Sequence, residues 1–251
     1  MCIRDRILTE ELKFLGKIVD IQASDGLSKY YLNFPSNIAS VNPDVLIHCA
    51  MSRKTNKTQL DENFLGLTRL LHEVTGNQKI QIIFISSLSS HSHSSSLYGR
   101  SKFNCEELLK KLPNSHVIRV GLITASPSGG FEKALERLAN MPLVLTSISN
   151  IQLYITPIHT LVDHISNVIQ NDLRINSKSV IIAEKQPIKL TTFLKTKRSR
   201  RTWVLIEFSF PLILKIIEFA HHIKLSLSLF DSVKSYSTPL ELRNFYWKSK
   251  E

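Results

Sequence analysis

The chain has 251 residues, which is enough for one α/β domain with a sizeable core and a small appended lobe. Its formal charge of +11 is compatible with a phosphate-bearing ligand, nucleic acid or an anionic membrane surface, and it selects none of them. The three cysteines, Cys2, Cys49 and Cys105, show neither the spacing of a metal site nor a disulfide framework, which favours a reducing cytoplasm.

Several short segments near the start of the chain have the patterns of regular structure. Leu8–Leu15 is predicted to be the end of a helix that a glycine terminates. Lys17–Ile21 and Lys29–Phe34 are then predicted strands. Asn42–Ala50 (NPDVLIHCA) gives a stronger strand signal, in which we expect His48 to pack at the strand end instead of binding a ligand.

A helix and a buried strand follow. Apolar residues at helical spacing predict a core-facing stripe, formed by Leu60, Phe64, Leu67, Leu71 and Val74. Ile82–Ile85 has the length and β-branched character of a buried parallel strand, which Ser86 and Ser87 close. The serine-rich loop that follows contains two histidines with no third metal ligand at a suitable spacing, so we expect a solvated loop. A second helix is predicted to start near Tyr98.

A serine, a tyrosine and a lysine around this loop form a pattern with chemical meaning. Lys102 follows Tyr98 by four residues, so the two share a helix face near the strand's carboxyl end, where open α/β sheets bind ligands. A cation about 4 Å from a phenol favours the phenolate by roughly 4 kcal/mol at an effective dielectric of about 20, which suits acid–base catalysis. Ser87 can hold the substrate oxygen that gains or loses the proton. The structural alternative is an ordinary amphipathic helix after a polar loop.

The Tyr-x-x-x-Lys spacing alone is a weak signal, because the chain contains it twice. Tyr246 and Lys250 repeat it near the end of the sequence, where no predicted strand and no serine precede them. We therefore interpret this second copy as a solvated terminal segment.

The second half of the chain alternates further strands and helices. His116–Leu122 and Ser179–Ala183 are predicted core strands, the latter as the last of the sheet. Residues 131–138 predict a helix between them, and Pro187–Leu194 is predicted to close the fold as strand, turn and helix. The basic run 195–201 is interpreted as a solvated turn, with phosphate or membrane contact as the alternative. Residues 203–220 are apolar but contain three charges and a proline, so they fail as a spanning helix, and a helix in the membrane interface stays open.

Taken together, these residues resemble the short-chain dehydrogenase/reductase superfamily, in its extended branch of nucleotide-sugar epimerases and dehydratases. The matching pattern is FISS…YGRSK, from Phe84 to Lys102. The resemblance implies that Tyr98 is the catalytic acid/base, that Lys102 promotes its ionisation and binds the nicotinamide ribose, and that Ser87 orients the substrate. It also implies an α/β fold of the Rossmann-like, doubly wound type, with a mostly parallel sheet and a small C-terminal substrate lobe.

The resemblance further implies a cofactor, NAD or NADP. We expect its contacts to come from the ends of the early strands and from the two helices after them, and the full set is Asn33, Phe34, Cys49, Ala50, Met51, Arg53, Asn63, Tyr98 and Lys102. Asn63 is expected to support the catalytic strand as well as the cofactor. The acidic residue that usually binds the adenosine ribose has no clear counterpart, since Asp20 is too early and Asp25 slightly late, so the choice between the two cofactors stays open.

The start of the chain departs from this pattern. A dinucleotide-binding fold opens with a strand, a glycine-rich turn and a helix, yet the first glycine here is Gly16. Residues 1–6 (MCIRDR) lack the apolar core of a signal peptide and look like translated sequencing adaptor, so we predict an artefactual leader. The first strand and the phosphate loop would then be missing and the chain as it stands inactive; a naturally degenerate start is the alternative.

We therefore predict an NAD(P)-dependent oxidoreductase of the epimerase/dehydratase type that acts on a nucleoside-diphosphate sugar in the cytoplasm. Two alternatives stay open: a catalytically silent dinucleotide-binding protein that stabilises an assembly, and an NADP-dependent reductase of a non-sugar carbonyl. Residues 7–195 would form the dinucleotide-binding domain with inserted lobe pieces, and residues 196–251 the C-terminal lobe and tail. A homodimer is compatible with this prediction, nucleic acid is not expected as a partner, and peripheral membrane contact is the weaker alternative.

Overall fold

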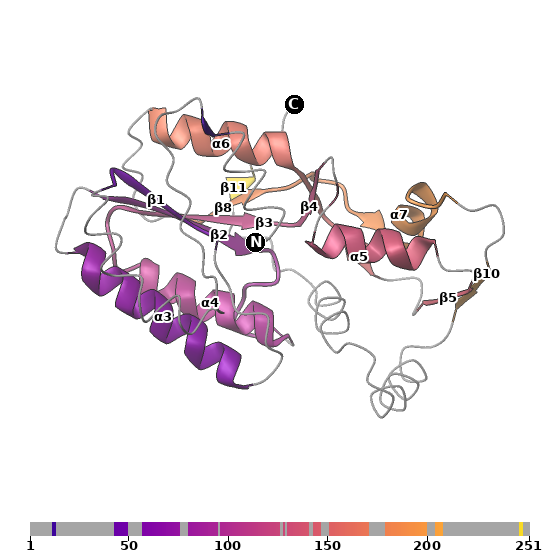
Figure 1. Cartoon of the computed structure of the whole chain (residues 1–251), viewed down its shortest axis with the longest axis horizontal. Coiled ribbons are helices and arrows are strands. Elements are labelled where there is room, and N and C mark those ends of the chain that lie inside the picture. The colour runs from indigo at the N-terminus through magenta and orange to yellow at the C-terminus, as the bar shows by residue number, and fades with distance from the viewer. Residues whose placement is uncertain are drawn as a thin grey trace.

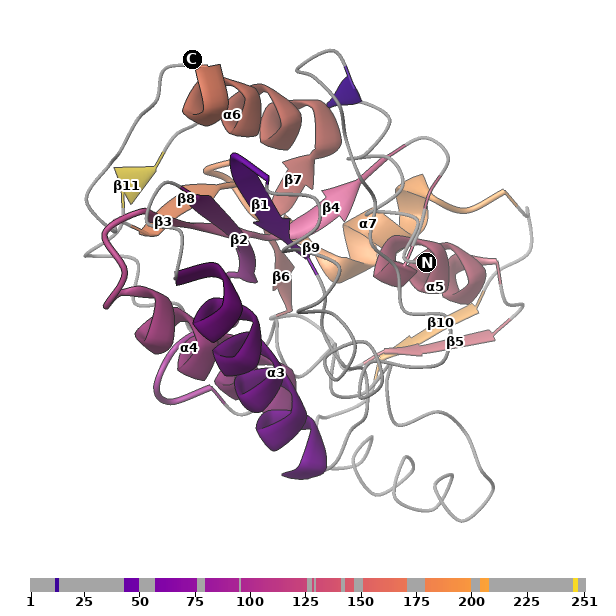
Figure 2. The ribbon, with the colours of Figure 1, turned by 60° about the vertical axis from the view of Figure 1, so that its left-hand side comes forward.

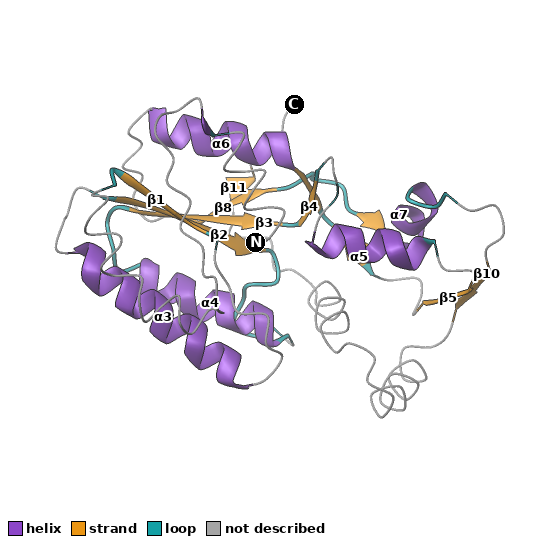
Figure 3. Ribbon diagram, viewed as in Figure 1, coloured by secondary structure: helices purple, strands orange, loops and turns teal. Residues whose placement is uncertain are grey.

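The structure is a computed structural model, in which a main sheet flanked by helices adjoins a second lobe of shorter elements (Figure 1, Figure 3). The residues that it describes are 12–13, 43–49, 57–75, 80–94, 96–125, 128, 130–140, 143–146, 151–170, 179–199, 204–207 and 246–247. Apart from residues 12 and 13, the predicted helix end and the two predicted strands before residue 35 lie outside this part of the chain.

Within the described residues the main sheet has five strands, all parallel, in the order β1-β2-β3-β8-β11. The strands are β1 (Val45–His48), β2 (Gln81–Ser87), β3 (Ser115–Val120), β8 (Ser179–Ile182) and β11 (Tyr246–Trp247). Every residue of β3 is buried, and so is every residue of β2 after the first. Such continuous burial is expected of parallel strands that are covered on both faces. The predicted doubly wound α/β fold is confirmed.

Helices cover both faces of the main sheet. α3 (Lys57–Thr75) and α4 (Leu97–Leu109) pack together on one face, and α6 (Ile158–Gln170) lies on the other (Figure 1). Because all five strands run parallel, their carboxyl ends lie at one edge of the sheet, where open α/β sheets bind ligands.

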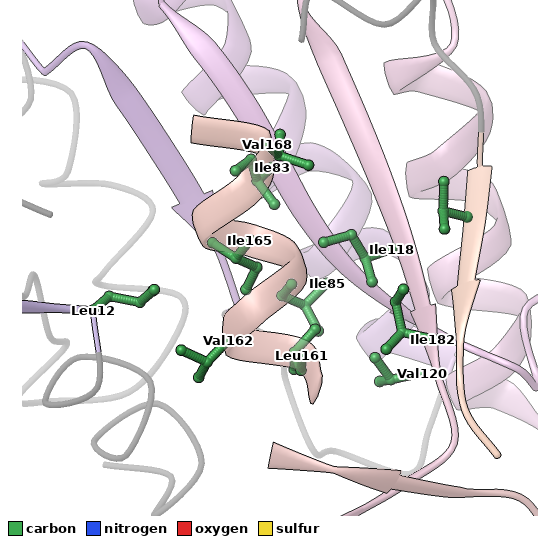
Figure 4. Packing of buried hydrophobic residues seen from close by; sticks show 11 residues of the cluster. Leu12, Ile83, Ile85, Ile118, Val120, Leu161, Val162, Ile165, Val168 and Ile182 are labelled. Atoms are coloured by element: carbon green, nitrogen blue, oxygen red, sulfur yellow. The ribbon is translucent and has the colours of Figure 1, made fainter. Parts of the chain in front are cut away.

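The alternation of side chains along β2 produces a core on each face. Ile82 and Phe84 join the core under α3 and α4, whereas Ile83 and Ile85 join the core under α6. Figure 4 shows the second of these cores, in which one stripe of α6 lies over the strands: Leu161, Val162, Ile165 and Val168. Full burial of side chains of this size stabilises the fold by about 1.5–3 kcal/mol each.

The second lobe is assembled from pieces that are far apart in the chain. Among the described residues its helices are α5 (Gly130–Ala139) and α7 (Leu190–Thr196). The described strands of this lobe form three pairs: β4 (Leu122–Thr124) with β7 (Ile155–Pro157), β5 (Leu143–Thr146) with β10 (Val204–Glu207), and β6 (Gln152–Leu153) with β9 (Ile188–Lys189). A separate apolar core, including Leu135, Leu153 and Phe193, holds these pieces together. Figures 1 and 2 both show α5 and α7 beyond the end of the main sheet.

A glycine marks the point where the chain passes from the main sheet to the second lobe. Gly121 separates β3 from β4, so the single strand predicted for His116–Leu122 is interrupted there. A Cβ atom at this position would lie 2.0 Å from the carbonyl oxygen of Tyr154. The Gly121 N–H donates to Thr156 Oγ1 at 2.9 Å, and the Thr156 hydroxyl donates to the carbonyl of Ile182 at 2.6 Å. The fully buried threonine therefore ties both parts of the molecule together at this crossing.

The predicted core-facing stripe of α3 is wrong at one position. Leu67 and Leu71 are buried as predicted, but the Phe64 side chain is 39% exposed; the side chains of Leu60 and Val74 lie outside the described part of the chain. Asn63 is 1% exposed and takes the inward position, because it donates to a side chain of α4. One residue along a helix is about 100° of rotation, which turns Phe64 away from the core.

The prediction that β8 is the last strand of the sheet is wrong. Tyr246–Trp247, in the predicted terminal segment, form β11 and pair in parallel with β8. A strand at a sheet edge presents unpaired N–H and C=O groups, and these groups bind such an added strand.

Most other predicted elements are confirmed by the described residues. β1 lies within Asn42–Ala50, α5 covers the helix predicted over residues 131–138, and the closing segment forms β9 and α7. Within the apolar run 203–220, Val204–Glu207 forms strand β10, and the rest lies outside the described residues. Among the described helices, not one is both long and apolar enough to cross a bilayer.

Candidate active site

Ser87 is the last residue of β2 and is held by the turn that follows it. Its hydroxyl lies 3.0 Å from that of Ser89 and accepts the Ser89 N–H at 3.2 Å, while its carbonyl accepts the Ser90 N–H at 3.0 Å. Ser87 is 6% exposed, so this hydroxyl reaches the sheet edge from a fixed position. The prediction that Ser86 and Ser87 close the strand is confirmed.

The helix that carries Tyr98 starts directly against the serine-rich loop. Ser96 caps α4 by accepting the Gly99 N–H at 2.9 Å, which satisfies one of the free donors at the helix start. A Cβ atom on Gly99 would lie 2.1 Å from the Ser94 hydroxyl oxygen and 2.3 Å from the Ser89 carbonyl oxygen. The glycine therefore allows the loop after β2 to pack on the first turn of α4, where Tyr98 is half-buried.

Lys102 lies one helical turn after Tyr98 and is almost completely buried, with 2% of its surface exposed. Its ammonium group donates to the carbonyl of Ile85 at 2.6 Å and lies 4.5 Å from the centre of the Phe84 ring. Both partners belong to β2, so the ammonium is fixed beside the strand that Ser87 ends. A cation over an aromatic ring in a desolvated place gains about 2 kcal/mol, which offsets part of the cost of burial.

The end of β1 contributes an uncharged neighbour to this arrangement. His48 is paired in register with Phe84, and the two ring centres lie 5.5 Å apart. Burial, and after it the positive charge of Lys102, lower the pKa of His48 to about 3. The imidazole is therefore neutral at physiological pH, and the packing role predicted for His48 is confirmed. Cys49 follows it and is half-buried.

A buried ion pair that the sequence analysis missed supports the end of β2. Glu106 of α4 is 0% exposed and receives two hydrogen bonds from Arg119 Nε at 3.0 Å each, and one from its terminal nitrogen at 2.5 Å. The Ser86 hydroxyl donates to the same carboxylate, and Ser86 is paired in register with Arg119. The network joins α4, β2 and β3. Its signals in the sequence were an arginine in an apolar strand and a glutamate four residues after Lys102.

Asn63 links the neighbouring helix to the same region. Its side-chain amide donates to the Ser101 hydroxyl at 3.0 Å, and both residues are 1% exposed. The Cys105 thiol lies 3.9 Å from the Asn63 carbonyl, and burial raises the pKa of this thiol to about 11, so it is unreactive. We expected Asn63 to support strand β2. In the structure its hydrogen bond to Ser101 supports α4, the neighbouring helix that carries Lys102.

Several predicted cofactor-binding residues lie outside the described part of the chain. They are Asn33, Phe34, Ala50, Met51 and Arg53. In the residues that the structure does describe, no three histidine, cysteine or acidic side chains lie close enough together to hold a metal ion.

The fold and this arrangement define a class of protein: a Rossmann-like α/β domain with an appended lobe and a Ser-Tyr-Lys pattern at the carboxyl edge of its sheet. The sequence matches no known family profile and no curated protein. Solved structures, however, have the same fold. A dTDP-4-dehydrorhamnose reductase from Bacillus anthracis, in complex with NADP, superposes with a TM-score of 0.65 at 16% identity, over 92% of this chain and 93% of that chain.

Two further structures have the fold of this chain. A dTDP-glucose 4,6-dehydratase from Bacillus anthracis, in complex with NAD, gives a TM-score of 0.55 at 10% identity, over 87% of this chain and 78% of that one. A UDP-N-acetylglucosamine 4-epimerase from Bacillus cereus gives 0.56 at 15% identity, over 82% and 84%. Together these similarities confirm the fold that the resemblance implied.

Proposed function

We propose that this protein is an NAD(P)-dependent oxidoreductase that acts on a nucleoside-diphosphate sugar as an epimerase, dehydratase or reductase. The solved structures of the same fold are a reductase, a dehydratase and an epimerase of such sugars, two of them in complex with NADP or NAD. The alternatives, a silent binding protein and a reductase of simple carbonyls, find no support among these similar structures.

One observation carries the proposal more than any other. The buried Lys102 ammonium is held against the carbonyl of Ile85, two residues before Ser87 on the same strand. A buried cation needs a reason, because desolvation of an ammonium costs several kcal/mol even after relaxation. Acid–base chemistry beside the strand end supplies that reason, since the charge can stabilise a phenolate one helical turn away on α4.

The proposed roles follow from these positions. Ser87 would donate a hydrogen bond to the substrate oxygen and orient it. Tyr98 would take the proton from the substrate hydroxyl or return it, and general acid–base catalysis of this kind contributes about 10²–10⁴-fold to the rate. Lys102 would stabilise the ionised tyrosine, and Asn63 would hold its helix in place through Ser101.

The described residues fit a nicotinamide dinucleotide. An ammonium group has three N–H donors, and the carbonyl of Ile85 takes one of them from Lys102, which leaves donors for the ribose hydroxyls. Cys49 follows β1 and packs partly buried against the core under α6, and we propose it as a further cofactor contact at the sheet edge. When bound, the nicotinamide would accept and return a hydride. Asn33, Phe34, Ala50, Met51 and Arg53 are proposed as further cofactor contacts from the sequence resemblance.

The partners and the location of the protein belong to the same proposal. Among the described residues, Cys49 and Cys105 form no disulfide, and we propose a reducing cytoplasm from this cysteine usage. A homodimer is part of the same proposal, and the exposed Phe64 and Leu65 of α3 are compatible with it. Residues 7–195 remain our proposal for the dinucleotide-binding domain with inserted lobe pieces, and residues 196–251 for the C-terminal lobe and tail.

The test compares two tyrosines that share the same spacing to a lysine. The full-length protein is first screened for turnover with NAD(H) and NADP(H) against UDP-glucose, dTDP-glucose and GDP-mannose. Tyr98→Phe should then lower turnover by at least about 100-fold and leave cofactor affinity nearly unchanged, because only the proton transfer is lost. Tyr246→Phe should behave like wild type. Lys102→Met should weaken turnover and cofactor binding together.

Two outcomes would remove parts of the proposal. A Tyr98→Phe variant that keeps more than a tenth of wild-type turnover would exclude Tyr98 as the acid/base. A wild-type protein that is stabilised by cofactor and by no nucleoside-diphosphate sugar would instead support the reductase of a simple carbonyl.

A further inference from the structure

A buried carboxylate near the start of α5 joins three segments of the second lobe. Glu132 is 1% exposed, and each of its two oxygens has a partner. Oε1 accepts from the Lys197 ammonium at 2.6 Å, just after α7, and Oε2 accepts from the Ala125 N–H at 3.1 Å, just after β4. A charge is tolerated at this depth only when it is paired and hydrogen-bonded. Glu132 therefore fixes both segments relative to α5.

Additional contacts bind the segment after α7 to α5. Lys197 also donates to Glu136 at 3.0 Å, one helical turn beyond Glu132. At the end of α5, the side-chain oxygen of Asn140 accepts from the Ser199 N–H at 2.9 Å and from its hydroxyl at 2.6 Å. Residues 197–199 are thus attached to α5 at several points.

The electrostatics of the cluster keep its cation charged. Partial burial acts to lower the pKa of Lys197, but its hydrogen bonds to Glu132 and Glu136 outweigh that effect and raise it. Burial acts in the opposite sense on Glu136, where hydrogen bonds from Ser128 and Lys197 nevertheless lower the pKa of the carboxyl. The basic run 195–201 was interpreted as a solvated turn, and this is wrong for Lys197, which is paired with Glu132 and Glu136.

Ala125 lies on the route from the sheet edge to the second lobe. Val120 at the end of β3 is paired in register with Ser87, and the Leu88 N–H donates to its carbonyl at 2.9 Å. From there β4 carries the chain over three residues, about 10 Å at the rise of a strand. The segment that Glu132 holds therefore leads from the strand end beside Ser87 into the second lobe.

We propose that Glu132 is a positioning residue that holds the segment leaving β4 against α5 and α7, and thereby sets the affinity for the nucleoside-diphosphate sugar. The inference rests on the proposed function and deepens it, since it assigns control of sugar-nucleotide affinity to an ion cluster outside the Ser-Tyr-Lys site. Removal of binding energy that is equal in the ground state and the transition state weakens binding without changing kcat.

Glu132→Gln is the sharpest variant for the test. A glutamine has one acceptor oxygen and one NH₂ donor, whereas Lys197 and the Ala125 N–H are both donors, so one of the two contacts must break. We expect the Kd of UDP-glucose, dTDP-glucose or GDP-mannose, whichever binds the wild type, to rise about tenfold in calorimetry. The Kd of NAD(H) or NADP(H) should change less than about twofold, and hydrogen exchange of the Ala125 amide should accelerate.

The chain offers matched controls for the lysine of this cluster. Lys197→Met should reproduce the Glu132→Gln effect, and Lys197→Arg should restore most of the affinity because it keeps the cation. Lys195→Met changes an exposed lysine in the last turn of α7, two residues before Lys197, and should leave the affinity unchanged. The double variant Glu132→Gln/Lys197→Met should weaken sugar-nucleotide binding less than the two single effects added together, because both remove the same contact.

The outcomes separate this inference from the proposed function. Faster exchange at Ala125 together with weaker sugar-nucleotide binding supports the positioning role. A Glu132→Gln variant that melts earlier but binds the sugar nucleotide as wild type does would reduce Glu132 to a purely structural residue and overturn the inference alone. A wild type that binds none of the three sugar nucleotides would overturn the proposed function and this inference with it.

Discussion

The main sheet and the second lobe use charged side chains in different ways. In the main sheet, Glu106 and Arg119 are 0% and 4% exposed at their side chains and form a closed, multiply hydrogen-bonded pair. In the second lobe, the side chains of Lys197 and Glu136 are 29% and 28% exposed, and only Glu132 is fully buried. The buried charges in the main domain therefore act as fixed supports for the end of β2. Those in the lobe are partly exposed, so water and salt screen their attraction more strongly.

The largest effect that this contrast predicts is on the buried pair. Arg119→Met leaves the Glu106 charge buried without its partner, and breaking a buried pair in this way costs about 3–5 kcal/mol. We expect a loss of this size in the free energy of unfolding, measured by urea denaturation. Lys110→Met breaks the exposed Lys110–Glu107 pair on the same helix and should cost less than about 1 kcal/mol.

A double variant shows whether the charges themselves matter. Glu106→Leu/Arg119→Met replaces the pair with apolar side chains, and such replacements are often neutral or even stabilising. It should be more stable than Arg119→Met alone. If Arg119→Met and Lys110→Met lower the free energy of unfolding by equally little, the distinction between buried and exposed ion pairs would be wrong.

The next effect concerns the crossing between the two parts. Gly121→Ala would place a Cβ 2.0 Å from the Tyr154 carbonyl oxygen, so the backbone of one strand must shift. Overpacking of this kind costs about 1–3 kcal/mol, and we expect a fall of that size in urea denaturation. Thr156→Ser keeps the hydroxyl that bonds both sides and should be milder than Thr156→Val, which removes it. An unchanged stability of Gly121→Ala would mean that the crossing is not close-packed.

The sequence predicts the main sheet better than the second lobe, and the reason is physical. Burial on both faces leaves continuous apolar runs such as Ile82–Ile85, and the helix that carries Lys102 follows a turn of serines. These signals are local in the chain. The spacing of Tyr98 and Lys102 predicts a shared helix face, and the structure adds what spacing cannot: the ammonium lies against β2, held by Ile85 and Phe84.

Interactions between distant residues escaped prediction. The Lys197–Glu132 contact joins residues that are 65 positions apart, so the basic run around Lys197 looked like a solvated turn. Phe64 looked like a core residue because its spacing fits a helical stripe, whereas the need to pair Asn63 with Ser101 rotates the helix. β11 has only two residues, too few to produce a strand pattern, and its place is set by the open edge of β8.

The smallest predicted effect is a pH dependence of stability that differs between the main sheet and the second lobe. Burial and the charge of Lys102 lower the pKa of His48 to about 3, below its ordinary value of 6.5. Between these values the unfolded chain binds a proton that the folded chain does not, so the stability falls as the pH drops from 6.5 toward 3. From pH 7.5 to 5.5 the loss from this group is about 1.4 kcal/mol. Urea denaturation at the two pH values should show a smaller loss for His48→Gln than for wild type.

The exposed His159 of α6 is the matched control, and His159→Gln should keep the wild-type difference between the two pH values. The buried His116–His164 pair, with Nε2 atoms 3.0 Å apart, is present in every variant, so it is common to all sides of the comparison. The pKa of Glu136 is lowered from 4.5, so its contribution in the second lobe is intact at pH 5.5 and is lost only at lower pH. Acid should therefore weaken the main sheet before the second lobe. If His48→Gln loses as much stability as wild type, His48 is not the group that makes the sheet acid-sensitive.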